Sequence, residues 1–117
     1  MILVKDGATF RQITPALIRI LGALESVVLE GRALVPGLPP DLVITSVNDS
    51  AHAPTSRHYR DEALDLRSKS FPTRASKDTF LMTLQARLGA QFTVLFENEH
   101  TDNEHFHVQV RKGGVYP

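Results

Sequence analysis

The sequence contains no cysteine among its 117 residues. This absence excludes thiol catalysis, iron–sulfur clusters, disulfide frameworks and every zinc site built on cysteine. Any bound metal must therefore be held by histidine, aspartate or glutamate. The chain has five histidines in two groups, His52 with His58 and His100 with His105 and His107.

The chain also lacks net charge and long apolar runs. Its 13 basic residues balance 13 acidic ones, which argues against a nucleic-acid binder that works by counterion release. The first apolar run ends at Lys5 and Asp6, so we expect neither a signal peptide nor a membrane-inserted segment, and synthesis in the cytoplasm. With 42% hydrophobic residues, we expect residues 1–117 to form one domain with its own core, and a monomer.

Two helices are predicted from apolar spacing. The first follows Thr14, which suits the cap, with Pro15 at its first position and Gly31 at its end. The second is indicated by Ser76 and Asp78, followed by apolar residues at helical spacing and closed by Gly89. The proline-rich stretch 34–40 between them predicts a loop.

Four strands are predicted, at residues 42–47, 63–67, 91–96 and 105–110, with a polar loop at 48–56. In the last strand Phe106, Val108 and Val110 would face the core, and His105, His107 and Gln109 would face away from it. The predicted class is α+β, with a small antiparallel sheet and helices packed on one face.

Three side chains could form a zinc site. A catalytic zinc ion takes three protein ligands at about 2.0–2.2 Å and keeps a fourth position open for water. His58 from a loop or strand entry, Asp65 from the neighbouring strand and His107 from the last strand could supply them.

These residues lie in the stretch SRHYRDEALD and in the later sequence EHFH. The two stretches together resemble the zinc D-alanyl-D-alanine carboxypeptidases and the phage L-alanyl-D-glutamate endopeptidases, a family with the hedgehog/DD-peptidase fold. Its pattern is Ser-x-His-x-x-Gly-x-Ala-x-Asp, followed by an acidic residue, two spacers and His. The matching positions here are Ser56, His58, Ala63, Asp65, Glu104 and His107. The phage-type members look the most similar, because they share a wider pattern around Thr45-Ser46, His52, Ser56, His58-Tyr59, Ala63, Asp65 and Arg67.

The resemblance implies one Zn²⁺ per chain and hydrolysis of a peptide bond in the peptidoglycan stem peptide, by an endolysin or a carboxypeptidase. It implies Glu104 as general base. However, Glu104 and His107 are an odd number of residues apart, so a regular strand would point them to opposite faces, and only a bend or bulge before His105 would bring both to the metal. His105 shares the face of His107 and is an active-site auxiliary, because a His-x-His pair in related zinc peptidases uses its first histidine in catalysis.

Other residues are expected around this site. Substrate contacts or hydrogen-bonding partners of the ligands are His52, Ser56, Tyr59 and Arg67, whereas His100 is expected in solvent. Three departures from the family pattern stand out. Asp61 replaces a glycine, Phe106 replaces the tryptophan of the carboxypeptidases, and residues 48–49 occupy a stretch where the family often has a substrate-binding arginine. Arginines that could replace it are Arg57, Arg60, Arg67 and Arg111.

Two further interpretations remain. Asp61 and Glu62 beside several arginines indicate a solvated, charge-compensated rim rather than a second metal site. The chain could also be a non-hydrolytic module of the same fold that holds zinc and binds a wall peptide or a virion partner, or a metal-free interaction domain. As a peptidase without a signal peptide, it would reach the cell wall through a phage holin, through lysis or as part of a virion.

Overall fold

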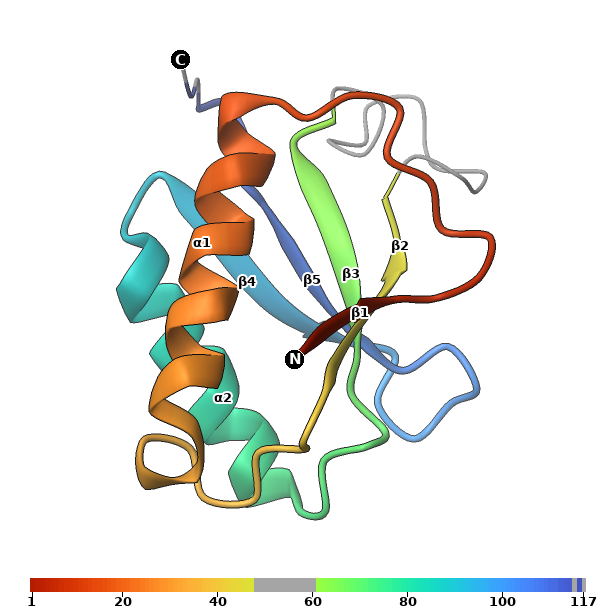
Figure 1. Cartoon of the computed structure of the whole chain (residues 1–117), viewed down its shortest axis with the longest axis vertical. Coiled ribbons are helices and arrows are strands. Elements are labelled where there is room, and N and C mark those ends of the chain that lie inside the picture. The colour runs from red at the N-terminus through yellow and green to blue at the C-terminus, as the bar shows by residue number, and fades with distance from the viewer. Residues whose placement is uncertain (48–60, 115, 117) are drawn as a thin grey trace.

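The computed structural model describes residues 1–47, 61–114 and 116. A five-stranded sheet in the order β1-β2-β3-β5-β4 forms one layer of the fold, and two α-helices in the described part of the chain form the other. Figure 1 shows both helices beside the sheet. The elements are β1 (Ile2–Val4), α1 (Pro15–Glu30), the short 3₁₀ helix η1 (Gly31–Ala33), β2 (Leu42–Ser46), β3 (Ala63–Arg67), α2 (Arg74–Leu88), β4 (Phe92–Glu97) and β5 (His105–Val110).

Helix α1 begins and ends where the sequence predicts. The Thr14 side chain accepts a hydrogen bond from the backbone N–H of Leu17, and Pro15 occupies the first turn, where no N–H is needed. Gly31 ends the helix at φ 63°, a conformation that glycine adopts without strain. Its buried face consists of Ala16, Leu17, Ile20, Ala23, Leu24 and Val27.

Helix α2 begins earlier than the sequence suggests. Its cap is Thr73, whose side chain accepts a hydrogen bond from the backbone N–H of Ser76 at 3.0 Å. The Ser76 hydroxyl lies 3.2 Å from the backbone N–H of Thr73, which completes a capping box. Ser76 is therefore the third residue of the helix and not its cap, while Gly89 ends the helix as predicted.

The sheet is mixed, so the prediction of an antiparallel sheet is wrong at one edge. Strand β1, which the sequence analysis did not predict, pairs in parallel with β2, and all other pairs are antiparallel. A parallel pair needs a crossover connection, and α1 lies in the chain between β1 and β2. Strands β3 and β5 have the predicted bounds, whereas β2 ends one residue early and β4 is shifted by one residue.

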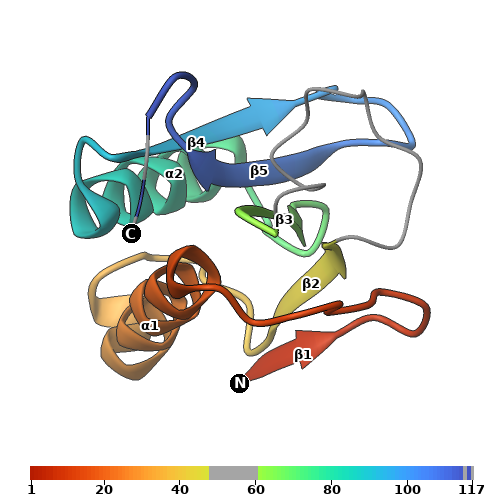
Figure 2. The same ribbon diagram turned by 90° about the horizontal axis from the view of Figure 1, so that it is seen from above.

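The core lies between the helices and one face of the sheet, as predicted. Figure 2 shows α1 and α2 side by side on the same side of the strands. Phe106 of β5 is fully buried among three other phenylalanine rings, with centroids 5.0–5.4 Å away, from Phe71, Phe80 and Phe96. Neither helix in the described ranges has the length and apolar character needed to cross a membrane.

Candidate metal centre

Two of the three predicted zinc ligands meet on the face of the sheet that points away from the helices. Asp65 of β3 lies directly opposite His107 of β5 in the antiparallel register. Residues opposite each other project to the same face, so strand pairing alone brings the two side chains together. His107 Nδ1 lies 2.8 Å from Asp65 Oδ1, and both side chains are about 85% buried or more.

The second ring nitrogen of His107 is also occupied. Its Nε2 lies 2.7 Å from Oε1 of Gln109, two residues along the same strand. The carboxylate and the amide oxygen both accept hydrogen bonds, so the ring is held between two acceptors. Burial alone would lower the pKa of His107, but the hydrogen bonds to Asp65 and Gln109 outweigh it and raise the pKa.

This donor set fits a metal ion. A carboxylate oxygen and an imidazole nitrogen lie side by side here, and both are ordinary zinc ligands. Asp65 and Gln109 stabilise positive charge at this point, because their hydrogen bonds raise the pKa of His107. Gln109 Oε1 accepts a hydrogen bond from Nε2–H, and in that tautomer of the neutral ring the Nδ1 lone pair would be available to a metal. Asp65 Oδ1 and His107 Nδ1 would hold the ion, and their direct contact would give way to it.

His105 lies beside this pair, as predicted from strand alternation. Its Nε2 is 3.1 Å from Glu97 Oε1 and 3.9 Å from Asp65 Oδ1. Its Nδ1 is 2.5 Å from the backbone oxygen of Asn103. Glu97 holds the ring from the neighbouring strand β4, where it lies opposite His105. His105 is thus an ionisable group within 4 Å of the Asp65 carboxylate on this face.

Glu104 lies in different surroundings. Its carboxylate accepts hydrogen bonds from the Ser68 hydroxyl at 2.5 Å, from Lys77 of α2 at 3.1 Å and from the backbone N–H of His100 at 3.1 Å. Lys77 belongs to the helix layer, so Glu104 points to the opposite side of the sheet from His107. Burial alone would raise the pKa of Glu104, but these hydrogen bonds outweigh it and lower the pKa to about 2.

The other predicted site residues lie either outside the described residues or elsewhere in the described part of the chain. His52, Ser56, His58 and Tyr59 lie outside the described residues, as do Arg57 and Arg60. Arg67 is exposed at the end of β3, opposite His105. His100 is exposed, as predicted, with its side chain 86% accessible. Within residues 1–47, 61–114 and 116, no three His, Asp or Glu side chains gather as a metal site.

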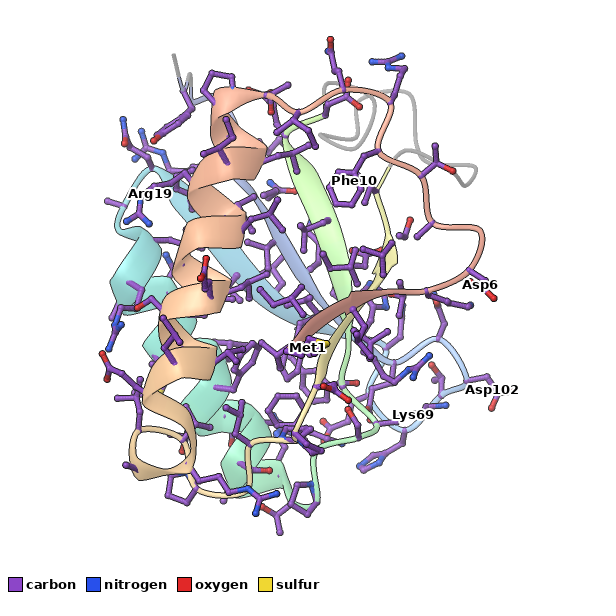
Figure 3. All side chains as sticks on the ribbon, in the orientation of Figure 1. Met1, Asp6, Phe10, Arg19, Lys69 and Asp102 are labelled. Atoms are coloured by element: carbon purple, nitrogen blue, oxygen red, sulfur yellow. The ribbon has the colours of Figure 1, made fainter. Side chains whose placement is uncertain are left out.

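The expectation of a solvated rim at Asp61 is wrong. Asp61 is fully buried, and its carboxylate accepts hydrogen bonds from Arg11 at 2.7 Å and Gln12 at 2.9 Å. Its backbone oxygen accepts a hydrogen bond from the hydroxyl of Thr14, the cap of α1. These contacts hold the N-terminal segment, which runs past Phe10 in Figure 3, against the entrance to β3. Asp61 also has φ 55°, the left-handed conformation that glycine adopts readily and aspartate tolerates.

Two neighbours of the pair were not predicted as site residues. Gln109 is signalled by its position two residues after His107, because alternate residues of a strand share a face. Ser46 lies opposite Asp65 only because the register between β2 and β3 shifts between Ile44 and Ser46. No pattern in the sequence predicts this shift in register.

No protein-family model, curated protein or solved structure matches the chain. The family resemblance therefore depends on the spacing of the motif residues alone.

Proposed function

We propose that this protein is a zinc metallopeptidase that hydrolyses a peptide bond in the peptidoglycan stem peptide. The observation that carries the proposal is the Asp65–His107 contact of 2.8 Å, made by two residues that the motif spacing had selected as ligands. His58, at the motif position of the third ligand, completes the proposed set.

A zinc ion bound in such a site would polarise the carbonyl group of the substrate and lower the pKa of its bound water to about 7. The protein's own groups orient the ligands. Gln109 accepts the Nε2–H of His107 and fixes the ring so that Nδ1 faces Asp65. The strand that carries His107 is in turn anchored by Phe106, which is buried among the aromatic rings of the core.

The contacts favour His105 over Glu104 as the proton-transferring group. His105 Nε2 lies 3.9 Å from Asp65 Oδ1 and faces the same side of the sheet as His107. Glu104 is engaged by Lys77 and Ser68 on the other side, and a carboxylate with a pKa of about 2 is a weak base at neutral pH. We therefore assign proton transfer to His105 and a structural role to Glu104.

The test is incubation of purified peptidoglycan with the zinc-loaded protein, followed by mass spectrometry of the released fragments. Fragments ending at L-alanine indicate an endopeptidase, and loss of terminal D-alanine indicates a carboxypeptidase. The His107→Ala variant should lose both zinc and hydrolysis, whereas His100→Ala, the same change at an exposed histidine, should keep both. No cleavage by a wild-type protein that binds zinc would refute the peptidase.

Two further variants test which residue, His105 or Glu104, transfers the proton. Glu104→Gln should bind zinc and keep most of its turnover at neutral pH, and His105→Ala should bind zinc but lose turnover by about 10²–10⁴-fold, as expected for a proton-transfer group. The reverse pattern, with turnover abolished in Glu104→Gln alone, would return the role of base to Glu104.

One observation favours a second candidate, a non-hydrolytic zinc module that binds a wall peptide or a virion partner. His105 is close enough to Asp65, at 3.9 Å, to become a fourth ligand with a small movement. Four protein ligands would close the site to water, which is typical of structural zinc. The absorption spectrum of the cobalt-substituted protein distinguishes the two, because added azide changes it only where a coordination position is open.

A further inference from the structure

Ser46, the last residue of β2, differs from the other buried polar side chains. Its Oγ is shielded from solvent and has no hydrogen-bond partner among the described residues. Each of the other buried polar side chains has one: Asp61 with Arg11, Ser68 with Glu104, and Ser76 with the backbone of Thr73. A buried hydroxyl without a partner destabilises a fold, so its presence calls for an explanation.

The register of the sheet brings Ser46 to the candidate metal centre. Ile44 lies opposite Leu66, yet Ser46 lies opposite Asp65, so β2 has one extra residue at this point. Without this irregularity, alternation would keep Ser46 on the core face with Ile44. Directly opposed residues have Cβ atoms about 4.5–5.5 Å apart, which is within reach of a hydroxyl and a carboxylate.

We propose that Ser46 is a positioning residue for Asp65, whose carboxylate accepts a hydrogen bond from the Ser46 hydroxyl when it leaves His107 Nδ1 to bind a metal ion. The inference rests on the proposed function for the metal itself. Carboxylate ligands are commonly held by such hydrogen bonds, and an ionised carboxylate accepts several at once. Rotation of the Ser46 hydroxyl breaks no existing hydrogen bond among the described residues, so the new bond costs little.

The experiment measures zinc affinity and thermal unfolding of the full chain, without any activity assay. Ser46→Ala should weaken zinc binding by roughly 10–100-fold, the usual effect of removing a group that orients a ligand. Ser46→Thr, which restores a hydroxyl, should recover most of that affinity. The metal-free Ser46→Ala protein should unfold at the same temperature as the wild type or higher, because the hydroxyl it loses has no partner.

Ser68→Ala is the matched control, since it removes a buried hydroxyl that donates to Glu104. It should lower the unfolding temperature and leave zinc affinity unchanged. Wild-type affinity in Ser46→Ala, or a clear loss of metal-free stability in that variant, overturns the role of Ser46 and leaves the proposed function standing. A wild-type protein that binds no zinc overturns the proposed function and the role of Ser46 with it, and the wild-type titration alone reveals this.

Discussion

The Glu104 carboxylate joins three parts of the fold, so its removal should have a measurable cost. Its donors come from the segment after β3 (Ser68), from α2 (Lys77) and from the β4–β5 loop (His100). The same loop is tied to the segment after β3 by the exposed ion pair of Lys69 and Asp102, both labelled in Figure 3. Glu104→Gln keeps a hydrogen-bond acceptor at this point but removes the charge.

The magnitude follows from the pKa of Glu104. A fall from 4.5 to about 2 in the folded protein corresponds to at most about 3–4 kcal/mol of stability. Solvent screening at the partly accessible Lys77 reduces this to about 1–2 kcal/mol. Because the folded pKa is the lower one, the contribution is complete above about pH 5 and is lost as the pH falls towards 2.

Urea unfolding of the wild type and Glu104→Gln at pH 7, 5, 4 and 3 measures this contribution. The variant should be less stable by about 1–2 kcal/mol at pH 7, and the difference should shrink steadily below pH 5. Asp78→Asn is the control, because it removes a carboxylate from the exposed pair with Arg74 and should cost less than about 1 kcal/mol. A difference that stays constant from pH 7 to pH 3 would refute the reasoning.

Three further changes test the fold. Asp61→Asn removes a buried charge, and asparagine tolerates the same left-handed backbone conformation, so the free energy of unfolding in urea should fall by about 1–3 kcal/mol. An unchanged free energy of unfolding would show that the Asp61 charge contributes nothing to stability. Gly37→Ala should destabilise by more than about 1 kcal/mol, because φ is 82° and the new Cβ would lie 3.0 Å from Ser76 Cβ. Gly22→Ala, in open space within α1, should instead stabilise by about 0.5–1 kcal/mol in thermal unfolding, and equal effects at the two glycines would contradict this account.

The helices could be predicted from the sequence because their signals are local. Thr14, Pro15 and Gly31 each act within a few residues of the helix end that they define. The same kind of signal placed the end of α2 at Gly89, but two hydroxyl residues, Thr73 and Ser76, compete for its start, and both take part in the capping box. Strand β1 has no such signal. Its three residues form a strand only because β2, about 40 residues later, supplies the partner.

Alternation along β5 predicted more of the candidate site than the motif did. It placed His105 and His107 on one face and made the side of Glu104 doubtful, and the contacts of Glu104 with Lys77 follow that alternation. The match to the motif does not by itself say which face a residue takes, and its spacing predicts a face only when strand alternation is applied to it. Ser46 is the opposite case: simple alternation puts it in the core, and only the extra residue of β2 brings it to Asp65. A site that spans several strands is therefore predictable from sequence only where every strand keeps its regular period.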